Sequence, residues 1–392
     1  MKFRSFVARI FPTVLLVVLT TSLSEQTSLG SGGSVKLLRV PNNGLQPQAV
    51  VDDHGVLHLI YFTGEPGGGD FFYVRRDAGR SEFTTPLRVN SESGSAIAIG
   101  TIRGAHLAVG KNGRVHVAWN GPQKPGGHEA PMFYSRMNDA GKSFEAQRNV
   151  MQFSGGLDGG GSVAADKLGN VYVAWHGKGD KPGEEHRRVW IARSSNDGTT
   201  FERETAAWNE PTGACGCCGM RAFADRQGRV HLLYRAARES VNRDMYLLTS
   251  ENRARSFSGV RLDKWKLDVC PMSSASLADG ASSTNELLAA WETQGQVYFT
   301  SIGAKAEESI LPIPATGIDG KSKHPAIAAN ERGDTILVWT EGTGWKKGGS
   351  LAWQLYDSHG KAVGKKGEVP GIPVWSFAAV FAEQDGSFTV IY

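Results

Sequence analysis

The most reactive side chains of this 392-residue sequence are its four cysteines, three of which lie within four positions. The segment GACGCCGM contains Cys215, Cys217 and Cys218, whereas Cys270 lies far downstream in DVCPM. One chemistry that suits them is a structural disulfide framework, for which four cysteines allow three pairings. Another is a labile redox disulfide, such as a strained vicinal bond between Cys217 and Cys218.

A soft metal site is the third chemistry that these residues allow. Thiolates and thioethers are the ligands that Cu(I) prefers, and Met220 and Met272 lie two residues after Cys218 and Cys270. The C-x-C-C spacing differs from the C-x₂-C pairs that dominate zinc sites. We expect no cofactor, and a copper-like ion bound by the four cysteines and two methionines is the alternative.

The scaffold that positions these residues is indicated by a motif that recurs seven times. Its turn glycines are 52 to 59 positions apart, and each is followed by a strand-like stretch that ends in an aromatic residue. In six copies the aromatic follows six residues after the glycine, and the copy that begins at Gly280 has a longer turn, ASSTNE. Residues in these stretches alternate as they do in a strand with two distinct faces. The seven aromatics are Tyr61, Trp119, Trp175, Tyr234, Trp291, Trp339 and Tyr392.

Each unit opens with two such strands, and most continue with a third and a weaker fourth, which is the pattern of a propeller blade. The chain ends after two strands of the seventh unit, and residues 35–40 (VKLLRV) resemble the fourth strand of the other units. These residues can complete the last blade and close the ring. The sequence therefore predicts an all-β, seven-bladed β-propeller over residues 35–392, with a six-bladed ring as the alternative.

The N-terminus predicts export. Lys2, Arg4 and Arg9 precede an apolar run at residues 14–19, and small residues follow at Ser22 and Ser24. This is the order of a secretory signal peptide, which we place at residues 1–24, before a flexible segment at residues 25–34. We expect a periplasmic or extracellular monomer with no membrane span after cleavage, and cysteines in these compartments usually form disulfides.

The charge of the chain argues against nucleic acid as a partner. Removal of residues 1–24 deletes three positive charges and no negative ones, which lowers the formal net charge from +4 to +1. The mature chain shows no basic stripe that could neutralise a phosphate backbone.

Residues 194–201, SSNDGTTF, resemble the Asp-box (S-x-D-x-G-x-T-W/F) of sialidase-like propellers, with Asn196 in place of the usual aspartate. Degenerate copies follow the third strand of other units, as at residues 250–257 (SENRARSF). Such a box is a turn in which a short polar side chain binds backbone amides and glycine supplies a positive φ. It identifies a fold and not a catalytic site.

The run from ACGCCGMRAFAD to WKLDVCPM looks like a subgroup of uncharacterised exported sialidase-like proteins. The resemblance implies a carbohydrate or glycoconjugate ligand. Sialidases bind the substrate carboxylate with three arginines and use a tyrosine–glutamate pair and an acidic residue. The chain lacks their clear Arg-Ile-Pro signature, since Arg39-Val40-Pro41 lies in the closing segment. A glycoside hydrolase, another polysaccharide-active enzyme and a non-catalytic binding or scaffold propeller all stay open.

Propeller ligands generally bind at the axial funnel, so the candidate residues come from the starts of the inner strands and from the loops that follow the second strands. The candidates for ligand binding are Gln46, His106, His324 and Trp375. The catalytic candidates are Arg103, Asp158, Arg221, Arg235, Glu239, Arg243, Glu292 and Glu341.

The repeat also places the cysteines. Cys218 precedes the inner strand of unit 4 and Cys270 precedes that of unit 5, which are equivalent positions in neighbouring blades. Because inner strands converge near the axis, we expect these cysteines to meet and to form disulfides that tie the two blades together.

Overall fold

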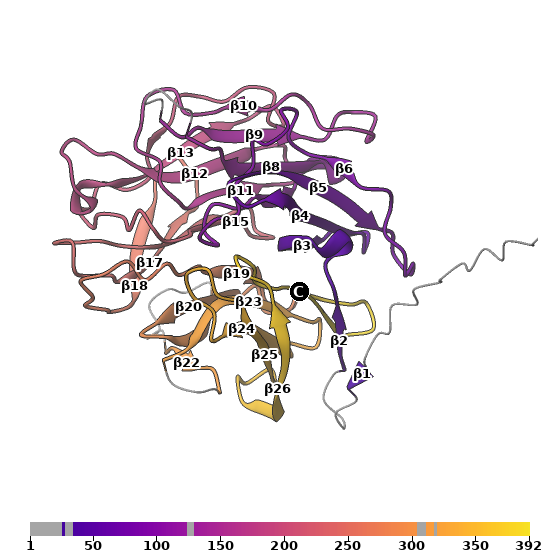
Figure 1. The fold of residues 1–392 in the computed structure, drawn as a ribbon. Coiled ribbons are helices and arrows are strands. Elements are labelled where there is room, and N and C mark those ends of the chain that lie inside the picture. The colour runs from indigo at the N-terminus through magenta and orange to yellow at the C-terminus, as the bar shows by residue number, and fades with distance from the viewer. Residues whose placement is uncertain (1–25, 28–33, 124–128, 304–310, 317–319) are drawn as a thin grey trace, which may run out of the picture.

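The computed structural model describes residues 26–27, 34–123, 129–303, 311–316 and 320–392, and the expected signal peptide at residues 1–24 lies outside them. Its strands form seven four-stranded sheets arranged as the blades of a propeller, with inner strands such as β3, β11, β15 and β23 near the centre of Figure 1. The predicted all-β, seven-bladed fold is confirmed.

Blades 1 to 3 are formed in chain order from inner to outer strand. Blade 1 contains β3 (Leu45–Val51), β4 (Leu57–Glu65), β5 (Gly68–Arg76) and β6 (Leu87–Arg88). Blade 2 contains β7 (His106–Val109), β8 (Val115–Asn120), β9 (Met132–Arg136) and β10 (Arg148–Asn149). Blade 3 contains β11 (Gly161–Ala165), β12 (Val171–Gly177), β13 (Arg188–Ser194) and β14 (Thr205–Ala206).

Blades 4 to 6 repeat this antiparallel order. Blade 4 contains β15 (Arg221–Ala224), β16 (Val230–Arg235), β17 (Met245–Ser250) and β18 (Ser258–Asp263). Blade 5 contains β19 (Ser276–Asp279), β20 (Leu287–Thr293), β21 (Gln296–Ile302) and β22 (Ile313–Pro314). Blade 6 contains β23 (Ser322–Ala329), β24 (Thr335–Glu341), β25 (Gly349–Tyr356) and β26 (Ala362–Ile372). Three single-turn 3₁₀ helices lie in loops, namely η1 (Pro41–Asn43), η2 (Lys111–Gly113) and η3 (Glu184–His186).

Blade 7 joins the two ends of the described chain, as the sequence predicted, but the N-terminal strand takes a different position. Its order is β27 (Ala379–Ala382), β28 (Phe388–Ile391), β2 (Val35–Leu38) and β1 (Gln26–Thr27). Strand β2 is therefore third and not fourth, and it runs parallel to β28. In the other blades a hairpin makes the third strand antiparallel, whereas no hairpin constrains a strand that comes from the opposite end of the chain.

The recurring aromatic residues form the inner core of the blades. Trp119, Trp175, Trp291 and Trp339 are completely buried, and the three tyrosines of the series are buried with them. The turn glycine of six units has a positive φ, for example +73° at Gly55, so the short turn that the repeat predicted needs this residue. Burying one large aromatic per blade at the same place supplies much of the hydrophobic driving force for the ring.

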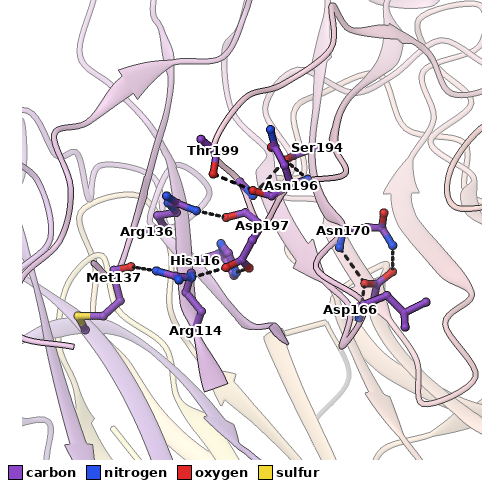
Figure 2. A network of polar contacts seen from close by, with 12 residues as sticks. Arg114, His116, Arg136, Met137, Asp166, Asn170, Ser194, Asn196, Asp197 and Thr199 are labelled. Atoms are coloured by element: carbon purple, nitrogen blue, oxygen red, sulfur yellow. Dashed lines mark hydrogen bonds and ion pairs between the residues drawn. The ribbon is translucent and has the colours of Figure 1, made fainter. Parts of the chain in front are cut away.

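The turn at residues 194–201 joins blade 3 to blade 2 through Asp197 (Figure 2). Ser194 Oγ accepts a hydrogen bond from the Gly198 amide at 3.0 Å, and Asn196 Oδ1 accepts one from the Thr200 amide at 3.0 Å. The Asp197 carboxylate binds the Arg114 guanidinium and lies 3.4 Å from His116 Nε2. Burial opposes its ionisation, but the contacts with His116 and Arg114 prevail and lower the pKa of Asp197.

We expect Asp197→Asn to lower the free energy of unfolding by about 1–3 kcal/mol, because it removes the charge of a half-buried ion pair and keeps a side chain that tolerates positive φ. Asp139→Asn is a matched control, since Asp139 also binds Arg114 but is 88% exposed where Asp197 is 21% exposed. Asp139→Asn should lower the free energy of unfolding by less than about 0.5 kcal/mol. Urea unfolding followed by tryptophan fluorescence measures both, and equal losses would contradict this role of Asp197.

Candidate functional site

The three clustered cysteines lie in the loop between β14 and β15, at the face of the propeller where the inner strands begin. We call this end the cysteine face. The Cys215 amide donates to the Arg235 carbonyl at 2.9 Å, and the Cys218 amide donates to the Cys215 carbonyl at 3.2 Å. The Gly219 amide donates to the Ser273 carbonyl of the blade 5 loop at 2.9 Å. These bonds fold the segment into a tight turn between blades 4 and 5.

The turn brings the sulfur atoms of all three cysteines together. Cys215 Sγ lies 3.1 Å from Cys218 Sγ and 3.5 Å from Cys217 Sγ, and the three sulfurs lie within 4.8 Å of one another. Cys215 and Cys218 thus form a C-x₂-C pair inside the C-x-C-C segment. All four cysteines are free thiols in the structure, so the disulfide framework stays a prediction.

Cys270 comes from blade 5 and reaches the cluster at Cys217, as the equivalence of the two blades predicts. It is exposed, whereas the other three cysteines are buried. Its interaction with the Cys217 thiol, together with burial, raises the pKa of Cys270 to about 12.

The electrostatics of the cluster favour one thiolate. Burial opposes ionisation of Cys218, but hydrogen bonds from the Cys215 and Cys217 thiols and the charge of Arg235 prevail, so the pKa of Cys218 lies well below its usual range. Hydrogen bonds to the neighbouring sulfurs, aided by burial, raise the pKa of Cys215. Arg243 is buried nearby, and the Cys215 charge and the Glu184 carboxylate raise its pKa against the effect of burial. Two guanidinium groups therefore compensate negative charge on the sulfurs.

The two methionines of the segment point to different places. Met272 is partly buried and packs against the cluster of Ile102 and the three cysteines. Met220 is buried among the apolar side chains between blades 3 and 4. Of the two methionines, only Met272 therefore packs against the cluster that contains the cysteines.

A loop from blade 2, residues 91–105, covers the axis at the cysteine face, and we call it the axial loop. Its Ala98 carbonyl accepts from Gln46 Nε2 of blade 1 at 2.6 Å, and its Ile102 carbonyl accepts from the Gly160 amide of blade 3 at 3.0 Å. Thr101 Oγ1 lies 3.2 Å from His324 Nε2 of blade 6. Contacts with blades on opposite sides of the ring require the loop to cross the axis. Below it lies an axial cavity of about 1130 Å³.

The structure places the candidate ligand-binding residues beneath or beside this loop. Gln46 is buried and donates a second hydrogen bond to the Trp375 carbonyl at 2.7 Å. His324 is buried between Thr101 and Ser274, and burial lowers its pKa to about 3. His106 lines the axial cavity next to Ser162, and burial and the nearby Arg221 charge keep its pKa well below the usual range. Gln46 and His324 thus anchor the axial loop.

The arginines of the catalytic list do not converge on one point. Arg103 forms an ion pair with Asp158 at 2.5 Å on the cysteine face. Arg221 donates to Gln48 Oε1 across the axial cavity at 2.8 Å, and burial lowers its pKa to about 10. The remaining two lie behind the cysteine loop, where Arg235 donates to the Arg243 carbonyl at 2.7 Å and Arg243 pairs with Glu184 at 2.7 Å.

The acidic candidates are also spread out. Glu292 is buried and accepts from the Gly295 amide at 2.6 Å. Glu341 is buried and binds Lys366 Nζ through both oxygens at 2.8 Å. Glu239 is exposed beside Arg238. Each of these three carboxylates belongs to a local structural contact of its own blade.

The sequence analysis did not single out Trp345, an exposed tryptophan on the cysteine face. It is 58% exposed in the loop after β24 and packs edge-on against Trp375 with ring centroids 4.6 Å apart. A side chain at Gly100 of the axial loop would meet Trp345, Met272 and Arg103, so these three groups surround one spot. The signal in the sequence is an aromatic residue within a glycine-rich loop, EGTGWKKGG.

The chain matches no protein-family model, and the search of curated proteins found no similar sequence. Solved structures do share its fold. The α-L-arabinanase of Penicillium chrysogenum, complexed with arabinobiose, has a TM-score of 0.53 at 16% identity and covers 82% of this chain and 95% of that chain. The NanB sialidase of Streptococcus pneumoniae has a TM-score of 0.53 at 11% identity and covers 86% and 81%. The leech intramolecular trans-sialidase has a TM-score of 0.50 at 8% identity and covers 89% and 86%.

The chain shares its β-propeller architecture with these two sialidases and the arabinanase. Identities this low establish the architecture and leave the activity to be argued from residues. Within the described ranges of this propeller, no helix has the length and apolarity needed to cross a membrane.

Proposed function

We propose that this protein is an exported propeller that binds a carbohydrate on its cysteine face. The observation that carries the proposal is the exposed indole of Trp345, braced edge-on by Trp375. A sugar ring has an apolar C–H face that stacks on an exposed aromatic ring and hydroxyl groups that need polar partners nearby. Export rests on the residue order at positions 1–24.

Polar groups around Trp345 suit the hydroxyl or carboxylate groups of such a ligand. Arg103 and Trp345 both approach the point where a side chain at Gly100 would lie, and Asp158 is partly exposed beside Arg103. Arg103 is held by two contacts with Asp158, so its guanidinium is preorganised. An aromatic platform next to a fixed cation and a carboxylate is a surface that binds either neutral or acidic sugars.

This surface supports binding better than hydrolysis. Glycosidases place two carboxyl groups on either side of the scissile bond, about 5–9.5 Å apart. Two acids near the three cysteines and Arg103 are already paired, since Asp158 pairs with Arg103 and Glu184 pairs with Arg243 and the Gly216 amide. Propellers of the same fold include an arabinanase that binds arabinobiose and a sialidase, which makes glycans the ligand class to test first.

We expect Trp345→Ala to weaken glycan binding by about 10- to 100-fold, the usual effect of removing an aromatic anchor from a binding surface. Phe153→Ala is a matched control, because Phe153 is 61% exposed on the outer part of blade 3. The labelled protein would first be applied to an array of neutral and acidic glycans, and the best ligand would then be titrated calorimetrically.

Two results would contradict the proposal. The first is that the wild-type protein binds no glycan on the array, and the second is that both substitutions weaken binding equally. Release of reducing ends from the bound glycan would show that the surface is catalytic and would turn attention to Asp158.

A further inference from the structure

We propose that Cys215, Cys217 and Cys218 form a buried three-thiolate site for one Cu(I) ion. The three sulfurs already lie within 4.8 Å of one another, at 3.1 and 3.5 Å for the two pairs that involve Cys215. Metal–sulfur bonds of ~2.3 Å place the sulfurs of a three-coordinate ion ~4.0 Å apart. Small rotations of the side chains therefore create the site without a change of the backbone turn.

The donor set selects a soft monovalent ion over zinc. Structural zinc sites take four ligands from cysteine, histidine and carboxylate groups. The only other cysteine of the chain is Cys270, which is exposed and lies outside the group of three sulfurs within 4.8 Å of one another. Met272 packs against the cluster that contains the three cysteines, and thiolate and thioether ligands suit Cu(I).

Two positively charged side chains near the thiols suit a site that becomes negatively charged when it binds Cu(I). Three thiolates and one Cu(I) carry a net charge of −2, which a buried site needs to have compensated. Arg235 and Arg243 are both buried beside the cluster, and the Nε–H group of each lacks a hydrogen-bond acceptor within the described part of the chain. These donors can bind the sulfurs once the sulfurs are ionised.

Filling the site exchanges protons and transfers no electrons. Cu(I) forms its three bonds to the sulfurs of Cys215, Cys217 and Cys218, and the S–H protons of these cysteines leave to solvent. Affinity should therefore rise with pH, since thiol protons are released when the ion binds. Cys217 is 9% exposed and borders the exposed Cys270, which gives the ion a route from solvent.

The test is an anaerobic titration of the full-length protein, reduced with a phosphine, using Cu(I) in competition with bathocuproine disulfonate. We expect one equivalent to bind with a near-ultraviolet thiolate-to-copper band. Cys215→Ser and Cys218→Ser should each lower the affinity at least about 100-fold, and Cys270→Ser should change it less than about 3-fold.

A methionine pair separates ligation from folding. Met272→Leu should lower the affinity about 10-fold, whereas Met220→Leu, at the buried position between blades 3 and 4, should leave it unchanged. Both replacements conserve volume, so the readout does not depend on whether a cysteine variant folds.

Three outcomes would overturn the proposal. The reduced wild-type protein could fail to bind Cu(I). Mass spectrometry could show a Cys215–Cys218 disulfide that persists in reductant. Zinc could bind with four ligands and be lost in Cys270→Ser, which would replace the three-thiolate copper site by a tetrahedral zinc site.

Discussion

Replacing Val35 with aspartate should lower the free energy of unfolding by about 4 kcal/mol or more, which is a large part of the stability of a typical domain. Val35 belongs to β2, the strand that closes the ring, and it pairs with Phe388 of β28. It is buried in the core shared by blades 6 and 7. The substitution loses about 1.5–3 kcal/mol of apolar burial and adds the desolvation of an unpaired carboxylate.

The control is Lys36→Asp, which introduces the same residue at the next position of the same strand. Successive side chains of a strand point to opposite faces, and Lys36 is only partly buried. Its substitution should cost less than about 1 kcal/mol. Urea unfolding monitored by tryptophan fluorescence compares the two variants. Equal losses of stability in the two variants would mean that β2 contributes only backbone pairing and that the Val35 side chain is not buried in the core, which would contradict the structure of blade 7.

Much of the ring could be predicted from the sequence because each blade repeats the same local pattern of turn and strand residues. A positive-φ glycine at a tight turn and a buried aromatic six residues later specify the first two strands of a blade without reference to the rest of the chain. The position and direction of β2 could not be predicted in this way. Whether Val35–Leu38 lies third or fourth is decided by how the two chain ends meet, and no local pattern encodes it.

The candidate site was predicted only in part, for a similar reason. The equivalence of blades 4 and 5 brought Cys270 toward Cys217, but it could not distinguish Met220 from Met272. Met220 is buried in the apolar core between blades 3 and 4, whereas Met272 packs against the cluster of Ile102 and the three cysteines. The axial loop has no strand periodicity, and its path depends on distant partners such as Gln46 and His324. In the structure these two residues, which were predicted to bind a ligand, form hydrogen bonds with the axial loop.

Acid should destabilise the protein below pH 6.5, and His324 should account for a large share of the loss. Burial, with a smaller effect of the Lys323 charge, lowers the pKa of His324 from 6.5 to about 3. Between these two values the unfolded chain binds a proton at this residue and the folded chain does not. The contribution is therefore fully present above pH 6.5 and is lost as the pH falls, by about 2 kcal/mol at pH 5.

Three other buried histidines also make the folded protein less stable as the pH falls. Burial lowers the pKa of His58, His116 and His176 despite hydrogen bonds that favour the charged form of each ring. Asp279 has the opposite sign, because burial raises its pKa and its contribution is lost as the pH rises. The three histidines outnumber this one carboxyl, so the net effect of these groups between pH 7 and pH 5 is a loss of stability.

The substitution His324→Asn measures how much His324 contributes to the loss of stability at acid pH. Asparagine tolerates the positive φ of +52° at this position and does not titrate. The variant should be less stable at pH 7.5, because the contacts with Ser274 and Thr101 weaken, yet it should lose about 2 kcal/mol less than the wild type on going to pH 5. Urea midpoints at the two pH values measure the slopes. If the stability of His324→Asn fell as steeply between pH 7.5 and pH 5 as that of the wild type, the acid sensitivity would arise from the other buried histidines. The role of His324 would then be limited to anchoring the axial loop.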